Sequence, residues 1–81
     1  MSIRWKEETI LFETFREADV WADSIANEIH GRTIDGYCTP DYKIACALAF
    51  YLAQVPISRV RTREIPFDEI IYYQVWIETS Q

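Results

Sequence analysis

The sharpest chemical signal in the sequence is a row of three arginines near the C-terminus. Arg59, Arg61 and Arg63 alternate with uncharged residues, which is the period of a β-strand. On one face of a strand their guanidinium groups would lie about 7 Å apart, close to the spacing of phosphates along a single nucleic-acid strand. Tyr72 and Trp76 lie on the neighbouring strand that we expect, and they could stack bases. These five residues form a candidate nucleic-acid face.

The alternative is that the same arginines pair within the protein. Glu69 and Glu78 fall on the expected partner strand, where cross-strand charge pairs are favourable. The formal net charge of −5 also opposes nucleic-acid binding over the whole surface. We therefore expect internal pairing ahead of phosphate binding.

Negative charge is concentrated in the first half of the chain. Residues 1–41 carry the whole excess, and residues 42–81 are balanced. The pattern of residues 15–30 predicts an amphipathic helix that ends at Gly31 in the left-handed conformation and has an acidic outer face. Such a face either keeps the protein in solution or binds a basic protein partner. The candidate partner-binding residues on this helix and the loop after it are Glu17, Asp19, Asp23, Glu28, Arg32, Asp35 and Tyr37.

Catalytic and metal chemistry find little support in the sequence. His30, Cys38 and Cys46 are potential metal ligands without paired spacing, and a structural zinc site needs four. The sequence has no glycine-rich phosphate loop. We expect no metal, no cofactor and no enzymatic activity. The two cysteines would lie too far apart for a disulfide, so we expect free thiols in a reducing cytoplasm.

Residues 39–57 are the only long apolar run, and the rest of the chain is expected to pack around them. Thr39 is a good N-cap, Pro40 suits the first helical position, and Pro56 ends the segment. We expect a central helix over residues 40–55 that is buried all round, and it is too short to span a membrane. Small residues recur every four positions along it: Ala45, Ala49 and Ala53.

The first 15 residues admit two interpretations. Residues 2–5 and 9–14 are rich in strand-forming side chains and could form a short hairpin. Heptad spacing of apolar residues instead allows one helix over residues 7–30. Thr14 and Glu17 form a capping box, which favours strand followed by a helix from residue 15.

After Pro56 the pattern changes to period two. Residues 59–63 and 69–79 predict a hairpin that turns at residues 65–68. We expect one small α+β domain over residues 1–81 with a three- or four-stranded antiparallel sheet and two helices, in the order ββααββ or βααββ.

In size, acidity, aromatic content and lack of recognisable catalytic residues, the chain is similar in build to the small acidic inhibitors that phages carry against host enzymes and defence systems, anti-CRISPR proteins among them. The resemblance is one of composition. It implies a protein-binding module that inhibits or regulates a larger partner. The alternatives are a single-stranded nucleic-acid binder and a homodimer joined through the C-terminal strand. The N-terminus leads into charge, so we expect no signal peptide and no membrane association.

Overall fold

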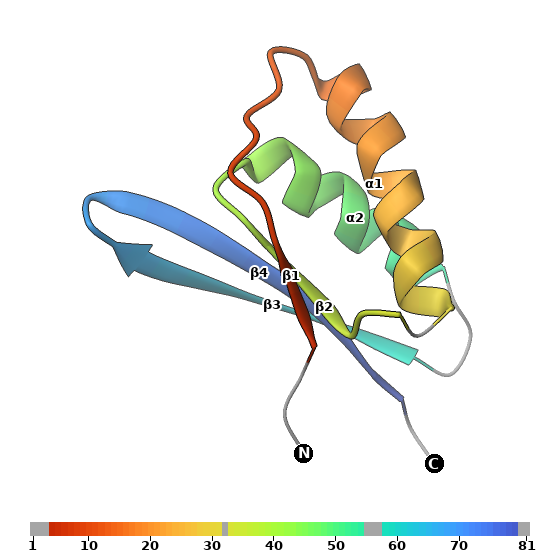
Figure 1. Ribbon diagram of the computed structural model, residues 1–81. Helices are drawn as coiled ribbons and strands as arrows, with labels where there is room; N and C mark the ends of the chain where they lie inside the picture. The colour runs from red at the N-terminus through yellow and green to blue at the C-terminus, as the bar shows by residue number, and fades with distance from the viewer. Residues whose placement is uncertain (1–3, 32, 55–57, 80–81) are drawn as a thin grey trace.

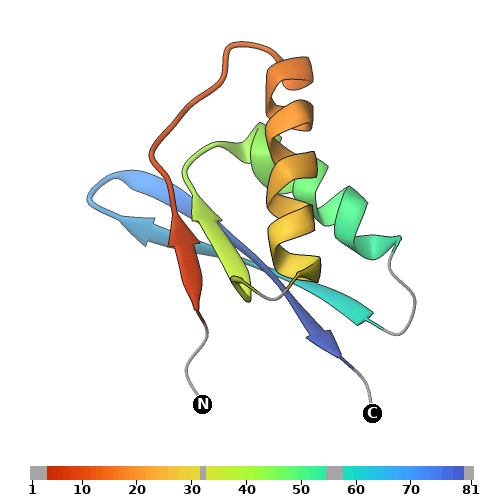
Figure 2. The ribbon, with the colours of Figure 1, turned by 45° about the vertical axis from the view of Figure 1, so that its right-hand side comes forward.

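A computed structural model describes residues 4–31, 33–54 and 58–79. Two helices lie on one side of a four-stranded sheet (Figures 1 and 2). The predicted fold class, a small α+β domain with two helices, is confirmed. In chain order the elements are β1 (Trp5–Glu7), α1 (Phe15–His30), β2 (Gly36–Thr39), α2 (Tyr42–Ala53), β3 (Ser58–Phe67) and β4 (Ile70–Thr79).

The strands follow the spatial order β1-β2-β4-β3. The pairs β2–β4 and β3–β4 are antiparallel, but β1 and β2 are parallel, so the sheet is mixed rather than antiparallel as predicted. The parallel pair arises because α1 carries the chain back to the same end of the sheet. The C-terminal strand β4 is paired on both sides. It therefore offers no free edge for the predicted homodimer, and the two edge strands are β1 and β3.

The C-terminal hairpin turns at Asp68 and Glu69, which have φ values of 55° and 68°. Two consecutive left-handed residues are typical of the type I′ turn, whose twist matches that of the flanking strands. The predicted turn at residues 65–68 is therefore placed too early, because residues 65–67 continue β3. Pro66 is tolerated there because β3 is an edge strand.

Helix α1 begins where the capping box predicts. The Thr14 hydroxyl accepts a hydrogen bond from the Glu17 backbone N–H and donates one to its carboxylate. At the other end Gly31 has φ −76°, so it is right-handed rather than left-handed as predicted. The buried face of the helix consists of Ala18, Ala22, Ile25, Ala26 and Ile29.

Within residues 4–14, the part of the N-terminal segment that the structure describes, there is one strand, β1, and the predicted hairpin does not form. Residues 8–14 form no strand, and Ile10 and Leu11 are exposed. The segment is instead tied to the start of α2, because the Phe12 N–H donates to the Asp41 carboxylate over 2.7 Å. The prediction of strand followed by helix holds only for β1 and the start of α1.

Helix α2 begins two residues later than predicted. Asp41, not Thr39, is the N-cap, and its carboxylate accepts from the Lys43 N–H over 2.8 Å. Thr39 ends β2 and is fully buried. The helix is also buried on one side only, because Tyr42 and Phe50 are 60% and 64% exposed. The predicted stop at Pro56 lies outside the described residues.

The core lies between the helices and the inner face of the sheet. Ile44, Leu48 and Leu52 from α2 pack with Tyr37 and Val75 from the sheet, and all five are fully buried. No helix among the described residues is long and apolar enough to cross a membrane.

Candidate binding face

The sheet face opposite the helices is not covered by either helix. Strand side chains alternate between faces, and Tyr37 and Val75 point to the helices, so their neighbours point away. The registers of the four strands place the other set on one surface, which we call the open face. It consists of Trp5, Glu7, Gly36, Cys38, Arg59, Arg61, Arg63, Ile65, Phe67, Ile70, Tyr72, Gln74, Trp76 and Glu78.

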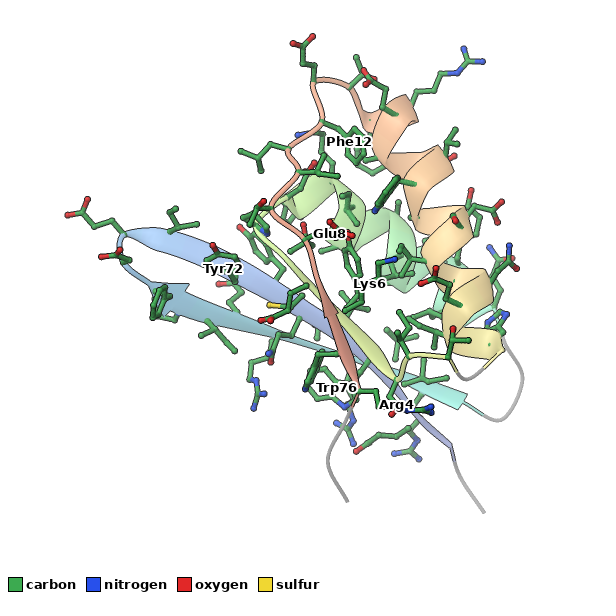
Figure 3. All side chains as sticks on the ribbon, viewed as in Figure 1. Arg4, Lys6, Glu8, Phe12, Tyr72 and Trp76 are labelled. Atoms are coloured by element: carbon green, nitrogen blue, oxygen red, sulfur yellow. The ribbon has the colours of Figure 1, made fainter. Side chains whose placement is uncertain are left out.

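A tryptophan–arginine cluster lies near the middle of the open face. The Trp5 and Trp76 rings meet edge to face with centroids 5.7 Å apart. The Arg63 guanidinium lies 5.4 Å from the Trp76 ring centroid, and its Nε and Nη2 donate to Gln74 Oε1 over 3.1 and 2.7 Å. This cation–π contact and the paired hydrogen bonds hold Arg63 in one orientation. Figure 3 shows Tyr72 and Trp76 along β4.

Gly36 makes room for this cluster. A Cβ at this position would lie 2.6 Å from Trp5 Cζ3 and 2.9 Å from Trp76 Cβ, and both distances are far below van der Waals contact. Only glycine therefore lets the Trp5 ring lie over β2.

The arginine row is confirmed as a row on one face, and its members are partly paired within the sheet. Arg61 Nε donates to Glu78 Oε1 over 2.7 Å, in an ion pair that is exposed to solvent. Arg59 is exposed and no partner for it is seen among the described residues. An exposed ion pair contributes only about 0–1 kcal/mol. Arg61 therefore remains able to exchange Glu78 for an acidic group on another molecule.

A groove of about 490 Å³ runs over the open face near the turn of the hairpin. Cys38 is buried beneath it, and burial, followed by the charge of Glu7, raises the pKa of this thiol. A thiol with a raised pKa is a weaker nucleophile at neutral pH. The groove is lined by Glu7, Glu8, Thr9, Cys38, Ile65, Phe67, Tyr72 and Gln74.

The hairpin end that bounds this groove projects beyond the helices (Figure 1). Large apolar side chains are exposed there, and Phe67 is 67% exposed. Ile70 and Ile71, on the other side of the turn, are also exposed. An apolar cluster at a projecting tip is a feature that partners commonly cover.

The predicted acidic surface does not assemble as one site. Glu28 pairs with Lys6 Nζ over 3.4 Å. Asp35 accepts two hydrogen bonds from the Arg4 guanidinium, at 3.0 and 3.1 Å, and this raises the pKa of Arg4. Tyr37 is fully buried, with its hydroxyl accepting from Trp21 Nε1 over 2.9 Å. Glu28 and Asp35 therefore lie in partly exposed ion pairs, and only Tyr37 is withdrawn from the surface.

The remaining acidic candidates lie along α1. Glu17 takes part in the helix cap, Asp19 hydrogen-bonds Tyr51 of α2 and thereby raises the pKa of that hydroxyl, and Asp23 is exposed. Arg32 lies outside the described residues.

Among the contributors to the open face that sequence reasoning missed are Trp5, Gly36 and Phe67. The sequence predicts a loop up to Cys38 and a helix cap at Thr39 where the structure has strand β2, so no predicted strand links Trp5 to Trp76. The alternation of Tyr37 and Thr39 with smaller residues was the available signal, because both side chains prove to face the core.

Metal ligation has no geometric basis in the described part of the chain, where no three His, Cys, Asp or Glu side chains gather. Cys38 and Cys46 are free thiols. Comparison of the chain with protein-family models, with curated proteins and with solved structures found no match in any of the three.

Proposed function

We propose that the chain is a protein-binding module that regulates a larger partner by docking its open face against it. The supporting observation is that one sheet face, which neither helix covers, carries the cluster of Trp5, Arg63 and Trp76 and, nearer the turn, the exposed Phe67. Tryptophan and arginine are the residue types most enriched at the energetic centres of protein interfaces. The groove beside them gives a partner side chain a place to insert.

The cluster is also pre-organised. Arg63 is held between Gln74 and the Trp76 ring, so little side-chain entropy would be lost when a partner covers it. The Trp5 ring is fixed in the same way by its contact with Trp76. Ordering costs of about 0.5–1.5 kcal/mol per long side chain are thereby reduced.

Charge indicates which partner surface would fit. On the open face three arginines outnumber two carboxylates, although the whole chain carries −5. The partner would therefore present an apolar patch with acidic residues at its border, opposite to the basic partner that the acidic helix suggested. The helical side of the molecule stays acidic and would face away from the partner.

The experiment compares two phenylalanines that are almost equally exposed. Phe67→Asp changes the open face, and Phe50→Asp changes α2 on the other side of the sheet, where the side chain is 64% exposed. Tagged variants are used for quantitative affinity capture from the source cells at low and high salt. The parent and Phe50→Asp should recover one partner, and Phe67→Asp should lose it. Loss in Phe50→Asp alone, or no partner for the parent, would contradict the proposal.

A second candidate is single-stranded nucleic acid. It is favoured by one observation, that Arg59, Arg61, Arg63, Tyr72 and Trp76 lie together on the open face. It is less favoured because Arg63 already stacks on Trp76, where a base would have to stack. Titration with a labelled oligonucleotide at low ionic strength tests whether the protein binds nucleic acid, because phosphate contacts give strong, salt-dependent binding under that condition. Absence of such binding removes this candidate.

We also propose that the protein works in a reducing compartment, the cytoplasm. This rests on the cysteines, because Cys38 and Cys46 are free and the Cys38 thiol is buried.

A further inference from the structure

Strand β3 forms one edge of the sheet. β3 is ten residues long and lies at the end of the sheet. No other strand of the described chain runs along its outer side. A long unpaired edge strand offers backbone groups to which an extended segment of another chain can pair.

The hairpin register identifies which backbone groups are free. In a two-residue hairpin, the residues flanking the turn form a hydrogen-bonded pair, and such pairs recur at every second position. Phe67 pairs with Ile70. The backbone N–H and C=O groups of odd-numbered β3 residues therefore bond to β4, and those of even-numbered residues point away from β4, toward the free edge. Pro66 has no N–H and stands at the end of the outward row. The outward N–H donors belong to Val60, Thr62 and Glu64.

The arginine row determines which segment can pair there. Arg59, Arg61 and Arg63 lie along the same edge on the open face. Residues opposite each other in an antiparallel pair place their side chains on the same face. A second copy of β3 would therefore bring its own arginines against these, and the like charges oppose self-association. An acidic segment would be attracted instead.

The helix side of the edge specifies the alternate side chains of that segment. A hollow of about 320 Å³ lies between α2 and the sheet, and the small residues Ala45 and Ala49 form part of its wall. Thr62 and Glu64, whose backbone groups point to the free edge of β3, also line this hollow. A strand added beside β3 would direct every second side chain toward this hollow. Because Glu64 borders it, apolar side chains of modest size fit there and acidic ones do not.

We propose that β3 accepts an extended segment of the partner as a fifth strand, with acidic side chains facing the arginine row and apolar side chains facing α2. The inference rests on the proposed function for the identity of the partner. The edge itself is tested with a defined peptide, so the two can fail separately.

The probe is a short capped peptide of alternating Glu and Val. Two controls have matched length: alternating Lys and Val, and Glu and Val in two blocks. Amide hydrogen exchange is followed by NMR. At saturation the Glu–Val peptide should slow exchange at Val60, Thr62 and Glu64 by about tenfold or more, and the controls should not. Binding without protection at these three amides would overturn the inference.

Variants separate backbone pairing from charge. Thr62→Pro removes an outward donor without removing a bond to β4, and Thr62→Val keeps the donor. The Glu–Val peptide should bind the Thr62→Val variant, and it should not bind the Thr62→Pro variant. If Thr62→Pro does not fold, Arg61→Glu combined with Arg63→Glu gives the second test. The affinity of that variant for the Glu–Val peptide should fall by about tenfold, and the variant should bind the Lys–Val peptide. Equal binding of both peptides to it would refute the charge assignment.

The outcomes also separate this inference from the proposed function. Loss of the cellular partner in Phe67→Asp together with normal recovery by Thr62→Pro would retain the open face and reject the edge. Peptide protection without any cellular partner would retain the edge and reject the proposed function.

Discussion

Replacing Asp41 with alanine should be one of the most damaging single changes in the molecule. The side chain is 1% exposed, and its carboxylate accepts from the backbone N–H groups of Phe12 and Lys43 over 2.7 and 2.8 Å. It also contacts Lys43 Nζ at 3.2 Å. The same carboxylate therefore caps α2 and, through the Phe12 N–H, holds the segment that precedes α1 against the start of α2.

The expected cost follows from these contacts. Loss of an N-cap costs about 1 kcal/mol. Leaving the half-buried Phe12 N–H without its acceptor costs at most about 1–3 kcal/mol, the range for a fully buried group. The ion pair with Lys43 is partly exposed and adds less than about 1 kcal/mol. The sum is about 3 kcal/mol, which lowers the melting temperature of a domain this small by about 15 °C. Asp41→Asn keeps one acceptor oxygen and should lose roughly half as much.

Thermal unfolding followed by circular dichroism is the assay. Asp23→Ala, which removes an exposed carboxylate from α1, is the control and should melt within about 2 °C of the parent. An Asp41→Ala variant that melts equally close to the parent would refute the reasoning.

The same residue predicts how stability depends on pH. Burial alone would raise the pKa of Asp41, but the hydrogen bonds from Phe12 and Lys43 outweigh it and hold the pKa below the ordinary value of 3.8. A carboxyl with a lowered pKa in the folded state contributes stability above its unfolded pKa, and this is lost as the pH falls through the folded pKa. The difference in unfolding free energy between parent and Asp41→Asn should therefore shrink below about pH 4.

Three further outcomes can be measured on the same material. Gly36→Ala should displace the Trp5 ring and cost about 1–3 kcal/mol in chemical denaturation, and an unchanged midpoint would contradict the crowding at that site. Burial raises the pKa of Tyr37 to about 12, and the Trp21 hydrogen bond opposes the shift. The contribution of Tyr37 to stability should therefore be lost as the pH rises from about 10 toward 12, and melting curves of the parent and Tyr37→Phe at alkaline pH would check this. Ala49→Leu should fill the hollow beside α2 at a cost below about 1.5 kcal/mol while blocking the Glu–Val peptide, and unimpaired peptide binding would count against the added strand.

Local sequence patterns were enough to predict the start of α1 and the C-terminal hairpin. The capping box at Thr14 located the start of α1, and the period-two pattern located the C-terminal hairpin, because both depend on neighbouring residues. Strand Gly36–Thr39 was missed because its state depends on pairing with β1 and β4 on either side. The cap of α2 was misplaced because Asp41 is selected by its contact with Phe12, 29 residues away.

The candidate site was predictable to a similar extent. The arginine row and its position beside Tyr72 and Trp76 follow from strand alternation and from hairpin pairing. The ion pairs made by Glu28 and Asp35 were not predictable because their partners are distant in sequence. Glu28 is separated from Lys6 by 22 positions and Asp35 from Arg4 by 31. Asp35 reaches Arg4 beside the parallel β1–β2 pair, and Glu28 of α1 reaches Lys6 of β1.

Site-specific photo-crosslinking in the source cells compares the two faces of the molecule in one experiment. p-Benzoylphenylalanine is introduced in place of Phe67 on the open face or in place of Phe50 on α2, two positions of nearly equal exposure. If the open face binds a protein partner, irradiation should give a discrete adduct from position 67 and none from position 50. An adduct from position 50 alone, or from neither position, would contradict the assignment of the open face as the binding surface.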